Sequence, residues 1–82
     1  MMFQGKIPVD LHGMNKYQAK VKIDSVLNRA NASVYQIELI HGYNFGTTLR
    51  ELVREEYQNH PKVKQVKPGT NSGITLLILR EF

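Results

Sequence analysis

The chain has 82 residues, which is enough for one domain and too few for two, so residues 1–82 are expected to form a single domain. It contains no cysteine, which excludes disulfides, zinc–thiolate sites and a cysteine nucleophile. It also has no apolar run long enough for a signal peptide or a membrane span. We therefore expect a soluble, cytoplasmic protein with no membrane partner. The formal net charge of +4 favours polyanionic partners, nucleic acid first, although it also lies within the ordinary range for a soluble protein.

The first half of the chain predicts a βαβ unit. Residues 6–11 alternate apolar and polar side chains, and Pro8 places this strand at a sheet edge because proline donates no ladder hydrogen bond. A helix follows over about residues 16–31, with Asn15 and Gln18 as a capping-box pair. Residues 34–40 form the second strand, and a strand–helix–strand unit of about 35 residues predicts parallel strands with a right-handed crossover.

The first helix divides into two faces. One is an apolar stripe that should face the core, formed by Ala19, Ile23, Val26, Leu27 and Ala30. The other is polar and should face away from it, and it carries Lys16, Lys20, Lys22 and Asp24.

The second half predicts a helix and a hairpin. The helix spans about residues 49–59, with Thr48 and Glu51 as its capping box. Residues 63–67 and 74–80 are strands joined by a short connection, which favours an antiparallel pair. The last strand is apolar at nearly every position, which places it in the centre of the sheet.

The element order βαβαββ defines the fold class as α/β, a two-layer α+β sandwich with a mixed four-stranded sheet. Both helices should lie on one face, because right-handed crossovers bring them to the same side. The other face then has no helix over it although the last strand offers it apolar residues, so it is a candidate surface for a homodimer or another protein.

Polar residues follow the first two strands, at the carboxyl ends where α/β sheets bind ligands. The first strand ends in Asp10-Leu11-His12-Gly13 and the second in His41-Gly42. We therefore expect Asp10, His12 and His41 to cluster at one edge of the sheet. Each histidine taken alone has a structural interpretation, which is the commoner one at a strand end, and Asp10 has the alternative of bonding loop amides.

The segment after the second strand is suited to bind an anion. Gly42 and Gly46 free the backbone to turn, Asn44 tolerates a left-handed conformation, and a helix N-terminus follows. Arg50 lies in the first turn of that helix, where the macrodipole disfavours a cation. Either a carboxylate such as Asp10 or Glu51 neutralises Arg50, or Arg50 faces a phosphate.

The combined motifs are more specific than any one of them. Residues 9–14 (Val-Asp-Leu-His-Gly-Met), the Asn-capped helix, residues 40–42 (Ile-His-Gly) and Gly46 with Leu49-Arg50 resemble the Smr (small MutS-related) domain over about residues 7–79. The resemblance implies the fold of the C-terminal domain of bacterial translation initiation factor three. It also implies binding or nicking of DNA or RNA, here by a domain that stands alone without the ATPase or clamp regions of some relatives.

One loop departs from the family pattern His-Gly-(Lys/Arg)-Gly-Thr-Gly. Tyr43 replaces the basic residue, Asn44 the middle glycine and Phe45 the threonine. Aromatic rings stack on unpaired bases, so the departure favours single-stranded nucleic acid unless the rings pack inward.

The leading interpretation is a DNA- or RNA-nicking endonuclease that hydrolyses phosphodiester bonds. Asp10 would orient His12 or bind a divalent cation (Mg²⁺ or Mn²⁺), and His12 or His41 would act as the acid–base group. The phosphate-binding residues would be Gly13, Gly42, Tyr43, Asn44, Gly46 and Arg50. No cofactor is firmly indicated, and no structural metal is expected because a fourth ligand is missing. The alternatives are a non-catalytic RNA-, DNA- or ribosome-binding module and a protein-interaction domain.

Overall fold

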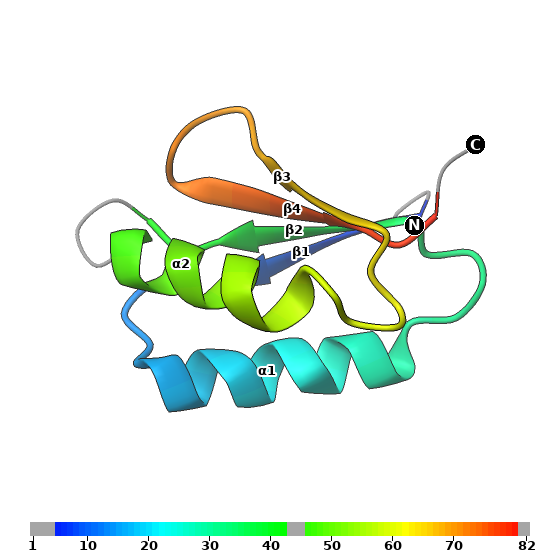
Figure 1. The fold of residues 1–82 in the computed structure, drawn as a ribbon, viewed down its shortest axis with the longest axis horizontal. Helices are drawn as coiled ribbons and strands as arrows, with labels where there is room; N and C mark the ends of the chain where they lie inside the picture. Colours follow the sequence, from blue (N-terminus) through cyan, green and yellow to red (C-terminus); the bar gives the residue numbers. More distant parts are fainter. Residues whose placement is uncertain (1–4, 43–45, 81–82) are drawn as a thin grey trace.

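Four strands and two helices follow one another in the predicted order βαβαββ (Figure 1). The structure is a computed structural model, and it describes residues 5–42 and 46–80. The elements are β1 (Lys6–Asp10), α1 (Lys16–Arg29), β2 (Gln36–Ile40), α2 (Gly46–Tyr57), β3 (Gln65–Pro68) and β4 (Ile74–Ile78).

The four strands form one mixed sheet in the order β1-β2-β4-β3. β1 and β2 are parallel, and β4 runs antiparallel to both β2 and β3. Pro8 therefore lies on an edge strand and the apolar β4 lies inside the sheet, as their sequences predict.

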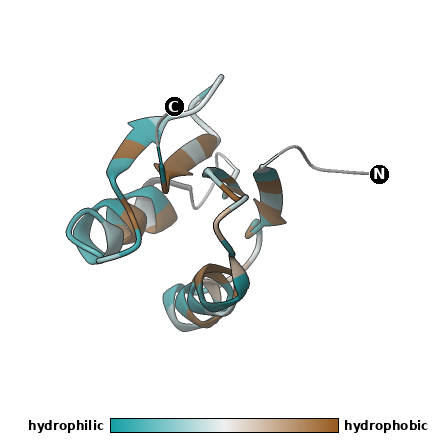
Figure 2. Ribbon diagram, turned by 90° about the vertical axis from the view of Figure 1, so that its right-hand side faces the viewer, coloured by the Kyte–Doolittle hydropathy of each residue, from teal (hydrophilic) through white to brown (hydrophobic). Residues whose placement is uncertain are grey.

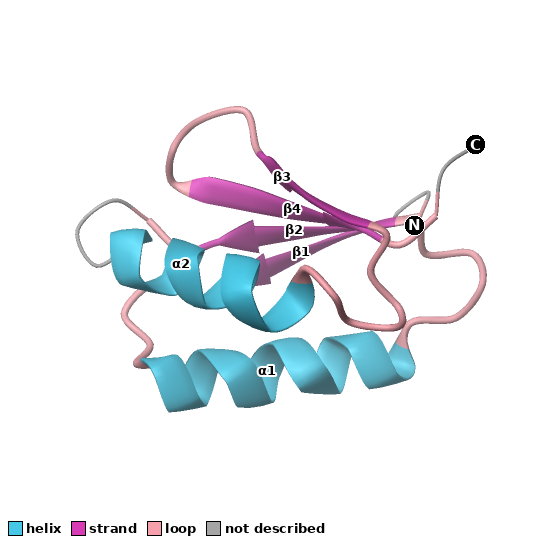
Figure 3. Ribbon diagram, in the orientation of Figure 1, coloured by secondary structure: helices cyan, strands magenta, loops and turns pink. Residues whose placement is uncertain are grey.

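Both helices cover the same face of the sheet, which confirms the predicted two-layer sandwich (Figures 1 and 3). Figure 2 shows the arrangement end-on, with the helices side by side beneath the strands. The core between the layers contains Val9, Leu11, Ala19, Ile23, Leu27, Ile37, Leu39, Leu49, Val53, Tyr57, Val63 and Leu77. Within the described part of the chain, no helix has the length and apolar character needed to cross a membrane.

The opposite face of the sheet carries apolar residues of β2 and β4. Ile40 pairs with Ile74, and Leu76 and Ile78 alternate with the buried Thr75 and Leu77 of the helix-covered face. A homodimer through this face stays a prediction, which sedimentation velocity of the wild type and of Leu76→Lys can check.

The polar side of α1 does not face solvent throughout. Tyr57 of α2 is fully buried, and its hydroxyl donates a 2.7 Å hydrogen bond to Asp24 Oδ1. Lys20 pairs with Asp24 at 3.0 Å and lies 5.4 Å from the centre of the Tyr57 ring. Lys20 and Asp24 therefore join the two helices, and only Lys16 and Lys22 of the predicted polar face are exposed.

One predicted capping box is confirmed and the other is wrong. Asn15 Oδ1 accepts from the Gln18 amide at 2.8 Å, and Gln18 Oε1 accepts from the Asn15 amide. Thr48 cannot cap α2, because a capping residue has a non-helical backbone and α2 already begins at Gly46.

Each strand differs from its predicted range by one to two residues at one or both ends, and the differences in β3 and β4 have visible hydrogen-bond partners. Val63 lies in a turn before β3, where its amide donates to the His60 carbonyl. β4 ends at Ile78 and not at Arg80, although the Leu79 amide still donates to the carbonyl of Tyr35, the residue before β2.

Removing the α1 cap should have a measurable cost. We expect Asn15→Ala to lower the free energy of unfolding by about 1 kcal/mol, because the Gln18 amide at the helix start loses its acceptor. Asn28→Ala, an exposed substitution later in α1, is the matched control and should be neutral or slightly stabilising. Equal urea-denaturation midpoints for the two variants would contradict the capping assignment.

Candidate functional site

The first polar segment is a turn that pairs His12 with Asp10. Asp10 ends β1 and is exposed, whereas its neighbours Val9 and Leu11 are buried beneath the helices. The His12 ring Nδ1 lies 2.7 Å from Asp10 Oδ1, and the His12 amide donates to the same oxygen at 3.1 Å. Gly13 completes the turn with a φ of 80°.

The carboxylate decides the state of the imidazole. Because a carboxylate only accepts, Nδ1 of His12 carries the proton and Nε2 is left to exchange one. The hydrogen bond to Asp10 and its negative charge raise the pKa of His12, and the same bond lowers the pKa of Asp10. The His12 side chain is 73% exposed, so Nε2 is accessible to a macromolecular substrate. A histidine in this setting can act as a general acid or base near neutral pH.

His41 lies in a different environment. It continues the alternation of Ile37 and Leu39 towards the helices, and it is only 2% exposed. Its Nε2 lies 2.8 Å from Thr75 Oγ1 and its Nδ1 lies 3.1 Å from the Gly42 carbonyl oxygen. Since a carbonyl only accepts, Nδ1 carries the proton and Nε2 accepts from the Thr75 hydroxyl.

Burial lowers the pKa of His41, and the charge of Arg50 lowers it further, against the opposing effect of the Gly42 carbonyl. His41 is thus a neutral, fully hydrogen-bonded side chain. Among the three predicted catalytic residues, all of which the structure describes, a hydrogen bond joins Asp10 to His12 and none joins either of them to His41. The geometry favours His12 as the acid–base group and His41 as a residue that positions the chain after β2.

Gly42 brings the two segments together. The amides of His41 and Gly42 both donate to the Gly73 carbonyl at 3.0 Å, which turns the chain at the end of β2. Gly42 has a φ of 81°, and a Cβ built on it would lie 3.6 Å from the Cβ of His12. The Leu11 amide also donates to the Ile40 carbonyl at 2.8 Å. The expected proximity of the two strand ends is therefore present.

The remaining predicted phosphate ligands lie in or beside the next loop. Tyr43 and Asn44, like Phe45, lie outside the described residues, so the stacking hypothesis stays a prediction. Gly46 is the first residue of α2, and Arg50 is half-buried one turn later. Within residues 5–42 and 46–80, no carboxylate forms an ion pair with Arg50, and Asp10 is bonded to His12. Of the two alternatives for Arg50, neutralisation by Asp10 or Glu51 is not seen among the described residues.

Two residues of this region were not predicted from the sequence. Thr75 holds His41, and the only sequence signal for it is one hydroxyl within an otherwise apolar strand. Arg54 lies beside Arg50 in a hollow between α2 and β3. In the part of the chain that the structure describes, no three histidines or carboxylates converge as metal ligands, and the prediction about Mg²⁺ or Mn²⁺ remains open to experiment.

Comparison with known proteins identifies the family. The family model of the Smr domain matches residues 9–80, almost the whole chain. The chain belongs to the Smr domain family. The Smr domain of Thermus thermophilus MutS2, solved by crystallography, superposes with a TM-score of 0.81 at 28% identity, covering 92% of this chain and 99% of that one. The expected fold is therefore confirmed.

Curated relatives of this Smr domain are much longer proteins. The chain is 31% identical over 80 residues to "Endonuclease MutS2" of Lactococcus lactis subsp. cremoris and, over the same length, to that of Caldicellulosiruptor saccharolyticus. Each match covers 92% of this chain and 10% of the relative, so this Smr domain spans about a tenth of their length.

The burial of neutral His41 predicts that the Smr domain loses stability on mild acidification. The unfolded chain takes up a proton on this imidazole below about pH 6.5, whereas the folded chain resists protonation, so the free energy of unfolding should fall as the pH drops. The effect of His12 on the free energy of unfolding has the opposite sign. Its raised pKa adds stability below about pH 6.5, and this stability is lost as the pH rises through the pKa of His12 in the folded chain.

Urea denaturation of three proteins between about pH 5 and 7.5 separates these effects, because the carboxylates stay ionised there. His12→Ala should lose stability towards pH 5 more steeply than the wild type, and His41→Gln should lose less. An acid-side loss that is unchanged in His41→Gln would refute the assignment of His41 as a buried neutral group.

Proposed function

We propose that this Smr domain binds nucleic acid and hydrolyses its phosphodiester bonds as a nicking endonuclease. The proposal is carried by one observation, the exposed His12 side chain whose ring Nδ1 is held 2.7 Å from Asp10 Oδ1, which leaves Nε2 for a substrate. The MutS2 relatives are named endonucleases, which supports the assignment, and the net charge of +4 supports a polyanionic substrate.

In the proposed reaction His12 is the general base. Its Nε2 takes a proton from the attacking water while the water oxygen forms a bond to phosphorus and the bond to the leaving oxygen breaks. The leaving oxygen takes a proton from solvent. Asp10 stabilises the imidazolium that forms, because its carboxylate remains hydrogen-bonded to Nδ1. Arg50 adds a positive charge that attracts the phosphate backbone of the substrate.

Among the described residues, Asp10 Oδ2 is an oxygen that could hold a divalent cation. Oδ1 of Asp10 accepts both bonds from His12, whereas no described residue donates to Oδ2. Mg²⁺ is commonly held by one or two carboxylates together with water and substrate phosphate, so Oδ2 is a suitable ligand. We expect cleavage to be faster with Mg²⁺ or Mn²⁺ than in EDTA.

The proposal is tested by cleavage assays on supercoiled plasmid, single-stranded DNA and RNA, each with Mg²⁺, Mn²⁺ or EDTA. The wild type should convert plasmid to the nicked form or cleave one of the single strands. His60→Ala removes an imidazole far along the chain from the site and should cleave at the wild-type rate. Activity at the wild-type level in equally purified His12→Ala would refute His12 as the general base. Binding without cleavage under every condition would leave the binding-module alternative.

A further inference from the structure

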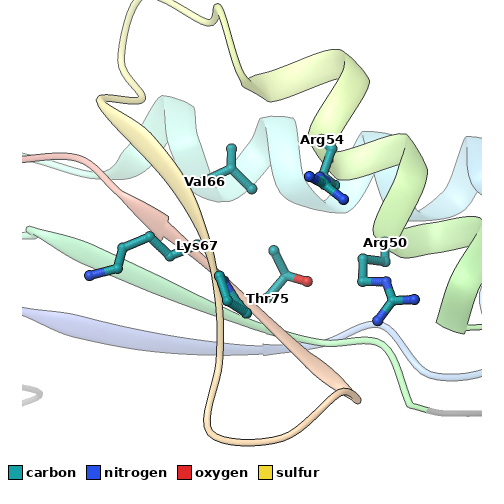
Figure 4. A pocket seen from close by; sticks show the side chains of 6 residues that line it. Arg50, Arg54, Val66, Lys67 and Thr75 are labelled. Atoms are coloured by element: carbon teal, nitrogen blue, oxygen red, sulfur yellow. The ribbon is translucent and has the colours of Figure 1, made fainter.

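A groove with an arginine-rich wall lies between α2 and β3, outside the Asp10–His12 pair. This α2–β3 groove has a volume of about 210 Å³ and is lined by Arg50, Arg54, Val66, Lys67, Pro68 and Thr75. Figure 4 shows Arg50 and Arg54 extending from α2 towards Thr75, while Lys67 extends on the other side of β3. A second hollow shares Arg54 and Val66 with it and continues past Lys64.

The lining residues of both hollows include no aspartate or glutamate. The ion pairs that involve only described residues are His12–Asp10, Lys20–Asp24 and Lys20–Glu56, so neither arginine of the groove is neutralised by them. Arg50 and Arg54 lie four residues apart on one face of α2, where like charges destabilise a helix. Guanidinium groups present a planar fork that matches phosphate.

The groove is joined to the Asp10–His12 pair through β2 and β4. Thr75 lines the groove and donates to His41, and the next residue, Gly42, lies against His12. The groove and the pair therefore lie on two sides of one short segment.

We propose that the α2–β3 groove is a second phosphate subsite, in which Arg50 and Arg54 hold a backbone phosphate flanking the one at His12. The nucleic-acid strand continues along β3 towards Lys64. The inference rests on the proposed function for the identity of the ligand, and it adds a binding track and two residues, Arg54 and Lys64, that the motif-based prediction lacks.

Binding of a fluorescein-labelled oligothymidylate tests the subsite by anisotropy at several salt concentrations. Arg54→Gln should weaken binding about tenfold, as expected for a lost charge-assisted contact. It should also reduce the slope of log K against log [salt] by about 0.7, the value for one phosphate contact to a single strand. Arg29→Gln, an exposed arginine of α1 that bonds only to Ser25 among the described residues, is the matched control and should change neither quantity.

The His41 imidazole gives a readout that does not depend on cleavage. Because the charge of Arg50 lowers the pKa of His41, a phosphate bound at Arg50 should raise that pKa in an NMR titration. The shift should appear in the wild type with oligothymidylate and be absent in Arg50→Gln.

The outcomes separate the two proposals. Equal affinity and salt slope for Arg54→Gln and Arg29→Gln overturn the subsite, and nicking by the wild type would then leave the proposed function intact. The expected loss in Arg54→Gln without any cleavage supports the subsite and overturns nicking. Absence of oligothymidylate binding overturns the subsite, and only the additional absence of cleavage of plasmid, single-stranded DNA and RNA overturns the proposed function. Poly-glutamate binding at the same affinity, with the same loss in Arg54→Gln, assigns the groove to an acidic protein partner and overturns the phosphate track.

Discussion

His12→Ala is expected to lower the single-turnover rate of nicking by about 10²- to 10⁴-fold, the usual contribution of a general acid or base. The variant should remain folded, because the His12 side chain is exposed and its ring is bonded only to Asp10 among the described residues. Binding of oligothymidylate should change little, since the groove arginines are untouched. The measurement is a nicking time course at saturating protein.

The matched variant at the other histidine of the site has a different expected signature. His41→Gln removes a buried ring that bonds Thr75 and Gly42, so it should lower stability and activity together. His12→Ala should lower activity alone. If His41→Gln lost activity without loss of stability while His12→Ala stayed active, the two roles would have to be exchanged.

Tyr57→Ala is expected to lower the free energy of unfolding by about 3–5 kcal/mol, the range for aromatic-to-alanine changes in cores. Tyr57 is the largest fully buried side chain, and it fills the space between α1 and α2. Burial, together with Asp24, raises the pKa of Tyr57, so the hydroxyl stays a neutral donor to that carboxylate. A domain of this size has a total free energy of unfolding of roughly 4–12 kcal/mol, so Tyr57→Ala should lose a large share of it.

Two companions make this prediction specific. Tyr57→Phe keeps the ring and loses only the hydrogen bond to Asp24, so it should cost about 1 kcal/mol. Tyr17→Ala removes an aromatic ring that is 78% exposed and should change stability by less than about 0.5 kcal/mol. Urea denaturation measures all three, and a loss in Tyr57→Ala as small as that in Tyr17→Ala would contradict the packing described.

The sequence predicts the sheet and helices well where one periodicity prevails over a whole element. The alternation in β1, the stripe in α1 and the apolar run of β4 each specify an element and its burial. The predicted start of α2 at about residue 49 is wrong, because Thr48 and Glu51 form a capping pattern inside a helix that begins at Gly46, two residues before Thr48. Local capping signals cannot decide between two nearby starts when the backbone before them is already helical.

The site was predictable in part for the same reason. Asp10 and His12 share a strand parity, which predicts their contact. The parity of His41 matches that of Ile37 and Leu39, so the alternation of β2 indicates that the His41 side chain is buried. Arg54 was not predictable, because a single charge on a helix is usually solvated, and its significance comes from the tertiary placement of Arg50 and Thr75 beside it.

The pH–rate profile of nicking in the wild type and in Asp10→Asn tests whether Asp10 tunes His12 as the acid–base group. Asparagine keeps an oxygen that accepts from Nδ1 but removes the negative charge that raises the pKa of His12. The limb of the profile that reports His12 should therefore move to lower pH in Asp10→Asn, with a lower maximal rate. If this limb lay at the same pH in both proteins, Asp10 would not set the pKa of His12.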